Sequence, residues 1–250
     1  MSAFKIAVCG RKGGVGKTTT SACLASYFAS HGLKVLVVDL DPQSNTGFVL
    51  GVDPVAPGTA ELILGRAPTP LKASGNLYVL PGGQSLQDQS ILHSESEELA
   101  FRIKDFHDFG VIIFDCPPGS DLLERLGLAA ANIALICTNA HPLGVIGAER
   151  VIDAIMQRQE RGLSGPKYSA LVLTQINRSR AFDKELPETL ARKYPNTPQL
   201  PIRQNSDLAW ATASRTPLMN NNPNSKSIDD IEKVARWVAQ ETVMKELNDG

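Results

Sequence analysis

Residues 9–20 read Cys-Gly-Arg-Lys-Gly-Gly-Val-Gly-Lys-Thr-Thr-Thr, and this stretch decides the fold of the chain. The apolar run Phe4–Cys9 before it predicts a strand, and Thr18–Ser30 after it predicts a helix that ends before Gly32. A glycine-rich loop between a strand and a helix can turn backbone N–H groups toward phosphate oxygens, and the helix N-terminus adds partial positive charge. The stretch therefore predicts a phosphate-binding loop (P-loop), although Arg11 stands where the general pattern has glycine.

Each polar residue of this loop has an expected task. The ammonium of Lys17 can reach the β- and γ-phosphates of a nucleotide, and the Thr18 hydroxyl can bind Mg²⁺. The residues of the loop expected to contact the nucleotide are Gly13, Gly14, Val15, Gly16, Lys17, Thr18 and Thr19. Lys12 is unusual, because a second lysine five positions before Lys17 is not needed to wrap the phosphates of its own nucleotide.

Apolar runs alternate with helical patterns along the chain. The expected strands are Phe4–Cys9, Val35–Asp39, Leu77–Leu80, Val111–Asp115, Ile133–Thr138 and Ala170–Ile176. Strands that alternate with helices indicate right-handed βαβ units. We therefore expect an α/β fold with a mostly parallel twisted sheet and helices on both faces. No linker or internal repeat divides the chain, so residues 1–250 are expected to form a single P-loop NTPase domain.

Carboxylates follow two of these strands. Asp39 and Asp41 come at the end of the second strand, and Asp115 ends the apolar run Val111–Asp115. The carboxyl ends of parallel strands meet at one edge of a sheet, where ligands bind. A carboxylate at such a strand end is suited to hold Mg²⁺ beside bound phosphates.

The combination of these segments resembles the ParA/MinD family of deviant Walker A ATPases. Residues 12–19 are similar to the family's P-loop, residues 39–43 (Asp-Leu-Asp-Pro-Gln) to its switch I, and residues 115–118 (Asp-Cys-Pro-Pro) to its switch II. The resemblance implies slow ATP hydrolysis with Mg²⁺ and dimerisation in the ATP state. It also implies that Lys12 reaches across the dimer to the partner's nucleotide.

Further residue roles follow from the same resemblance. Asp41 would orient or activate the attacking water, and Asp39 would support Mg²⁺ and Lys17. Asp115 and Thr18 would hold Mg²⁺, and Asn177 would lie near the adenine. The catalytic residues expected from the resemblance are therefore Lys12, Lys17 and Asp41.

Three functions remain open for such an ATPase. The form of switch I favours a ParA-type partitioning protein, which binds non-specific DNA as an ATP dimer, is released by a cargo-linked ParB-like activator, and is cytoplasmic but nucleoid-associated in the ATP state. The formal net charge of −1 argues against constitutive nucleic-acid binding, but two half-patches joined by dimerisation could bind DNA. The arginines expected on that surface are Arg178, Arg180, Arg203 and Arg215.

The two alternatives are a MinD-like membrane ATPase and a metallocluster protein of the nitrogenase iron-protein type. The chain ends Met-Lys-Glu-Leu-Asn-Asp-Gly, which is acidic and lacks the apolar bulk of a membrane anchor, so no membrane partner is expected. A bridging cluster would need two cysteines per subunit, for which Cys116 and Cys137 are candidates. Both cysteines lie in or beside apolar runs, which favours buried thiols.

Overall fold

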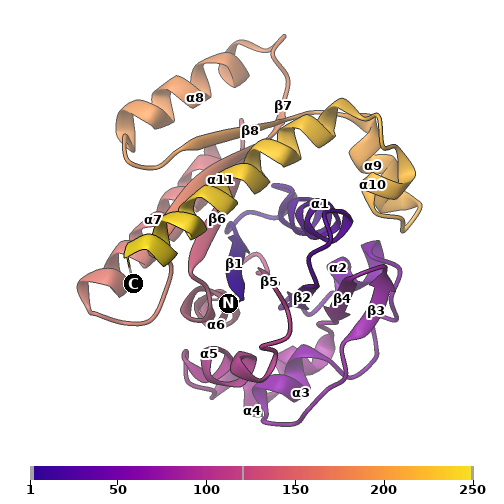
Figure 1. Ribbon diagram of the computed structural model, residues 1–250. Coiled ribbons are helices and arrows are strands. Elements are labelled where there is room, and N and C mark those ends of the chain that lie inside the picture. The colour runs from indigo at the N-terminus through magenta and orange to yellow at the C-terminus, as the bar shows by residue number, and fades with distance from the viewer. Residues whose placement is uncertain (1–2, 120, 249–250) are drawn as a thin grey trace.

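The computed structural model describes residues 3–119 and 121–248, and the side chains of these residues as far as 241. Within them the chain forms one eight-stranded sheet in the order β3-β4-β2-β5-β1-β6-β7-β8 (Figure 1). The strands are β1 (Phe4–Cys9), β2 (Val35–Asp39), β3 (Leu71–Ser74), β4 (Leu77–Leu80), β5 (Val111–Asp115), β6 (Ile133–Asn139), β7 (Tyr168–Ile176) and β8 (Gln199–Arg203). All neighbouring pairs are parallel except β3 and β4. The predicted α/β fold is confirmed.

Helices cover both faces of the sheet. The α-helices are α1 (Lys17–Ser30), α2 (Asn45–Val49), α3 (Thr59–Ile63), α4 (Gln89–Leu92), α5 (Glu98–Arg102), α6 (Asp121–Ala130), α7 (Pro142–Glu160), α8 (Ala181–Lys193), α9 (Ser206–Ala213), α10 (Leu218–Asn221) and α11 (Lys226–Asn248). Two 3₁₀-helices among the described residues are η1 (Gln84–Gln87) and η2 (Ile103–Asp105). Helices α1 and α11 pack together on one face, and α6 and α7 pack on the strands from the other.

The core is divided by the sheet into two apolar layers, because successive side chains of a strand point to opposite faces. In β1, Ile6 and Val8 belong to the layer under α1 and α11, and Ala7 and Cys9 belong to the layer under α6 and α7. The central strands β2 and β5 are buried along their whole length. This arrangement fixes the carboxyl ends of β1, β2 and β5 next to one another.

The two edges of the sheet are built differently from its centre. Strand β3 pairs with β4 alone and is irregular between Lys72 and Ser74, and Lys72 is exposed. Strand β8 pairs with β7 and carries an exposed proline, Pro201, at its middle position. Neither edge strand was among those expected from the sequence.

Candidate active site

The P-loop stands where predicted, between β1 and α1. Gly16 has a left-handed backbone (φ 80°) immediately before the first residue of α1, a conformation that disfavours other residues. It offers no side chain to cap the helix, so the first N–H groups of α1 remain available to a phosphate. Lys17 is buried, and its ammonium donates to the carbonyl oxygen of Lys12 at 3.3 Å. This hydrogen bond thus joins the beginning of the loop to its end.

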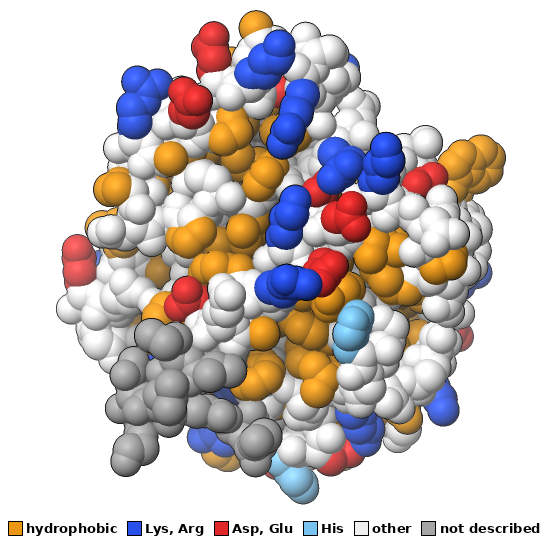
Figure 2. Space-filling model, turned by 45° about the horizontal axis from the view of Figure 1, so that its top comes forward, with side chains coloured by type: hydrophobic (Ala, Val, Ile, Leu, Met, Phe, Trp, Pro, Cys, Tyr) orange, Lys and Arg blue, Asp and Glu red, His pale blue; other side chains and the backbone are white. Residues whose placement is uncertain are grey.

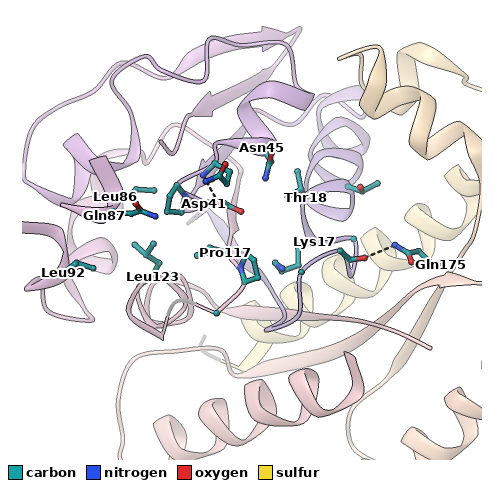
Figure 3. Close-up of a pocket in the computed structure, with 18 residues that line it drawn as sticks. Lys17, Thr18, Asp41, Asn45, Leu86, Gln87, Leu92, Pro117, Leu123 and Gln175 are labelled. Carbon is teal, nitrogen blue, oxygen red and sulfur yellow. Dashed lines mark hydrogen bonds between the residues drawn. The ribbon is translucent and has the colours of Figure 1, made fainter. Parts of the chain in front are cut away.

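A cavity of about 690 Å³ lies over this loop. Its walls come from the P-loop, from switch I, from the segment after β5 and from α6 (Figure 3). The lining residues include Gly13, Gly14, Gly16, Lys17, Thr18, Thr19, Asp41, Asn45, Pro117, Leu123 and Gln175. Lys17 and Asp41, which the sequence predicted for catalysis, therefore share one cavity, as do most of the expected phosphate-binding residues.

Asp115 and Asp39 lie behind the residues that line this cavity and are hydrogen-bonded to two of them, Thr18 and Asp41. They are paired in register on β5 and β2, and both are fully buried. Burial raises the pKa of Asp39 well above its usual range, and the neighbouring Asp115 raises it further, although backbone N–H donors oppose the shift. Burial also raises the pKa of Asp115. Two apposed carboxylates in a buried position favour a nearby cation.

Hydroxyl groups surround Asp115. Thr18 Oγ1 donates to Asp115 Oδ2 at 2.9 Å, Ser21 Oγ donates to Oδ1 at 2.9 Å, and Thr46 Oγ1 also donates to Oδ2. The donors available to a metal here are all oxygens, which is the set that Mg²⁺ prefers. The residues present therefore fit Mg²⁺, which Thr18, Asp115 and Asp39 would hold. When bound, Mg²⁺ would neutralise negative charge on the phosphates.

Switch I is held in place by Asp39. Its carboxylate accepts from the backbone N–H groups of Asp41 at 2.9 Å, Thr46 at 3.0 Å and Gly47 at 3.2 Å. Asp41 in turn accepts from the N–H of Gln43 at 2.9 Å and is 8% exposed. Asp39 therefore positions the segment that carries Asp41 toward the cavity.

Sequence reasoning missed three side chains at this site. Thr46 joins switch I to Asp115, and Thr174 Oγ1 donates to the carbonyl oxygens of Val15 and Thr138 at 2.8 and 3.0 Å. Gln175 Nε2 donates to the carbonyl oxygen of Gly14 at 3.0 Å and has a left-handed backbone (φ 57°). Thr174 and Gln175 lie near the end of an expected strand and Thr46 follows the switch I sequence, so hydroxyl and amide residues near strand ends were the available signal.

A second cavity, of about 500 Å³, adjoins the first through Gly16, Thr19 and Gln175. Its other side is lined by Ile202 of β8, Leu208 of α9 and Asn205, which lies between these two elements. Asn177, which was expected beside the adenine, lines neither cavity; its side-chain oxygen accepts from the N–H and hydroxyl of Ser179 at 3.0 and 2.7 Å. The local bulge in β7 between Leu173 and Ile176 brings Gln175 to the cavity instead.

The four arginines expected to contact DNA have different surroundings. Arg178 and Arg180 are exposed in the turn between β7 and α8. Arg203 makes a two-pronged ion pair with Asp230, with Nε and Nη2 at 2.6 and 2.8 Å from the two carboxylate oxygens. Arg215 donates to the carbonyl oxygens of Phe48 and Val52 and stacks over the Phe48 ring. Basic and acidic side chains are interspersed over this part of the surface (Figure 2).

The two cysteines considered as candidates for a metallocluster are both buried, as expected for buried thiols, and lie in different layers of the core. Cys116 is in the layer under α6, and Cys137 is in the layer under α1. Burial raises the pKa of Cys137 to about 12, which disfavours the thiolate that iron requires. Among the described residues there is no group of three His, Cys, Asp or Glu side chains that could hold a metal ion. Over the same residues, no helix is long and apolar enough to cross a membrane.

Fold, loop and carboxylates together define a P-loop ATPase of the deviant type. A family model described as an AAA domain matches residues 3–165, which is more than half of the chain, and the chain belongs to this family, in its ParA/MinD group. It is an ATPase whose cofactors are ATP and Mg²⁺.

Relatives of known name support the same assignment. The chromosome-partitioning ATPase Soj of Treponema pallidum is 29% identical over 91% of this chain and 94% of its own length. The septum site-determining protein MinD of Escherichia coli K12 is 31% identical over 70% of this chain and 68% of its own length. The structure of MinD from Pyrococcus horikoshii, solved with Mg-ADP, has a TM-score of 0.78 and is 26% identical, covering 97% of this chain and 98% of that one.

Proposed function

We propose that this chain is a ParA-type positioning ATPase. In this proposal residues 1–250 act as one ATPase domain, two copies close on ATP, and the dimer binds duplex DNA without sequence preference. A cargo-linked activator of ParB type then stimulates hydrolysis and releases the DNA. The observation that carries the proposal is the exposed Arg178–Arg180 turn, which follows directly on the strand whose Gln175 lines the ATP cavity. Cations at this place can be brought together when two copies meet over their nucleotides.

The catalytic steps are assigned to a small set of side chains. Lys17 binds the β- and γ-phosphates, and Thr18 lies beside the Mg²⁺ position. Asp41 orients the water that attacks the γ-phosphate, and Asp39 holds Asp41 in place through the backbone hydrogen bonds of switch I. Lys12 acts in the partner's site, where a cation would stabilise the charge that spreads over the phosphoryl group in the transition state.

For the nucleobase we propose the second cavity. It shares lining residues with the phosphate cavity and combines apolar walls at Ile202 and Leu208 with the polar side chains of Gln175 and Asn205. An adenine needs this combination of flat apolar contact and a few hydrogen bonds. Gln175 therefore replaces Asn177 as the residue proposed to lie next to the base.

Two of the four arginines expected to contact DNA are left out of the proposed DNA-binding surface. Arg203 and Arg215 are engaged within the chain, by Asp230 and by backbone carbonyl groups, so the proposal assigns DNA binding first to Arg178 and Arg180. Each neutralised phosphate makes the fall of log affinity with log salt steeper by about 0.9 in slope, and dimerisation doubles the number of arginines that face the DNA. The two arginines of one copy are therefore expected to hold DNA only when a second copy adds its own two.

The test is binding of non-specific duplex DNA by the Asp41→Ala variant, at about 50 and 200 mM salt, with ATP, with ADP and without nucleotide. The proposal expects binding with ATP only and steep weakening by salt. Binding that is equal in all three nucleotide states would contradict a dimer-dependent surface. No binding in any state would move the proposal from DNA to a lipid surface, which co-sedimentation with anionic liposomes would then test.

A further inference from the structure

Arg11, the residue that departs from the general P-loop pattern, is tied to helix α6. Its Nε and Nη2 both donate to Glu124 Oε1, at 3.0 and 2.9 Å, and its Nη1 lies 3.6 Å from the carboxylate of Asp121. The Glu124 side chain is only 3% exposed, and that of Arg11 is 27% exposed. Charge-assisted pairs of this kind, with one member buried, have a well-defined geometry.

The backbone beside Arg11 is confined from a second side by helix α7. A Cβ added at Gly147 would lie 3.4 Å from the Lys12 nitrogen and 3.6 Å from Arg11 Cβ, so α7 packs directly on these two residues. The carbonyl oxygen of Lys12 is also the acceptor for the Lys17 ammonium. Residues 11 and 12 are thus held between α6, α7 and the phosphate-binding lysine.

Helix α6 is also part of the nucleotide cavity. It begins at Asp121, shortly after the segment Pro117–Gly119 that lines the cavity, and Leu123 on its first turn lines the cavity as well. The next residue in the chain is Glu124. The first turn of α6 therefore places Leu123 in the wall of the cavity and Glu124 in hydrogen bonds with Arg11.

We propose that Arg11 and Glu124 are a positioning pair for ATP hydrolysis. The pair fixes the Arg11–Lys12 backbone relative to α6. The switch II segment leads into α6, so a movement of that segment would also move Lys12. Neither residue lines the phosphate cavity, so both act through Lys12. The inference rests on the proposed role of Lys12.

A merely structural role predicts a different result, since a buried carboxylate that loses its partner destabilises any protein. Burial raises the pKa of Glu124, and the charge and hydrogen bond of Arg11 oppose that shift. The single variant Arg11→Gln would leave Glu124 unpaired. The double variant Arg11→Gln with Glu124→Gln removes both charges and keeps two side chains that can hydrogen-bond, so the folded state should be retained.

The experiment measures kcat, KM for ATP and the melting temperature of the double variant, without DNA or activator. We expect kcat to fall about 10- to 100-fold, as for a misplaced catalytic group, with KM within about threefold of the parent and a parental melting temperature. The matched control is Arg125→Gln, an exposed arginine on the same helix that lines the same outer cleft as Arg11, and it should leave all three values unchanged.

Addition of Lys12→Gln separates this inference from the proposed function. If Arg11 acts through Lys12, the triple variant should be no slower than Lys12→Gln alone. Parental kcat in the double variant, or fully multiplicative losses in the triple variant, would overturn the inference. Normal turnover of Lys12→Gln alone would instead overturn the proposed role of Lys12, and failure to bind DNA would overturn only the DNA part of the proposed function.

Discussion

The phosphate edge of the sheet and the arginine-bearing surface (Arg178, Arg180, Arg203 and Arg215) contain charged residues of opposite kinds, and these residues have different partners in the two regions. At the phosphate edge, Asp39 and Asp115 are buried and receive hydrogen bonds from several segments that all face one cavity. On the arginine-bearing surface, Arg203 of β8 and Arg215 after α9 are directed back to Asp230 and to backbone carbonyl groups. Buried charge marks the site in the first region, whereas in the second the charge contributes to packing. A count of arginines alone therefore overestimates a nucleic-acid surface.

The largest effect is expected at the phosphate edge, from Asp41→Ala. Turnover should fall at least about 100-fold, which is the usual contribution of a positioned acid or base, while ATP binding is kept. Phosphate release and binding of a fluorescent ATP analogue measure the two quantities. Rapid multiple turnover by this variant would show that another residue orients the water.

A packing defect behind the same edge should have the next largest effect. A Cβ added at Gly127 would lie 2.6 Å from Cys116 Sγ and 3.0 Å from a methyl carbon of Leu40, so Gly127→Ala should overpack the contact between α6 and the sheet. We expect a loss of about 1–3 kcal/mol in the free energy of unfolding, measured by urea denaturation. Gly110→Ala, where the nearest atom would be at 3.6 Å, is the control and should unfold close to the parent.

On the arginine-bearing surface, Asp230→Asn tests whether Arg203 serves stability. Burial tends to raise the pKa of Asp230, but the hydrogen bonds and charge of Arg203, together with the charge of Lys233, outweigh it and hold the pKa below its usual value. A carboxyl with a lowered folded-state pKa stabilises the protein above its unfolded pKa and stops doing so as the pH falls through the folded value.

We therefore expect Asp230→Asn to cost about 2 kcal/mol at neutral pH, the usual size for hydrogen bonds to a charged group. The gap between variant and parent should close as the pH falls below the ordinary carboxyl range, near about pH 4 and lower. Thermal unfolding across this range measures the gap. A gap that is constant with pH would mean that the ion pair is not its source.

The smallest effect is expected on DNA binding, and it should separate the exposed Arg178 and Arg180 from Arg203, which is paired within the chain. Replacement of Arg178 and Arg180 by alanine should make the fall of log DNA affinity with log salt shallower, by about 0.9 in slope for each phosphate that is no longer neutralised. The melting temperature should not change. Arg203→Ala should do the reverse, with a lower melting temperature and a nearly constant salt slope. Equal salt slopes in both variants would remove the distinction drawn between these arginines.

Much of the phosphate edge was predictable because its chemistry is local in sequence. Strands Phe4–Cys9, Val35–Asp39 and Val111–Asp115 have the predicted bounds, because the latter two are apolar up to their final aspartate and buried throughout, and residues 6–9 of the first are apolar and buried. The edge strands β3 and β8 were missed, because Leu71–Ser74 is half polar and Pro201 interrupts the apolar pattern of β8. Tertiary neighbours, not intrinsic preference, decide those two strands.

The unpredicted parts of the site depend on contacts between segments far apart in the chain. Thr46 reaches Asp115 across 69 positions, and Gln175 reaches Gly14 across 161. The partners of Arg203 and Arg215 were hidden for the same reason. A motif records which residues are adjacent in the chain, and only the folded chain brings Asp230 to Arg203.

The construction of the two sheet edges has a consequence for self-association. An exposed edge strand can accept a strand from another molecule, which leads to β-aggregation at high local concentration. The exposed Pro201 on β8 lacks the N–H needed for such a ladder, and β3 presents an exposed lysine beside an irregularity. Both edges of the sheet therefore carry features that disfavour the lateral addition of a strand from a second copy.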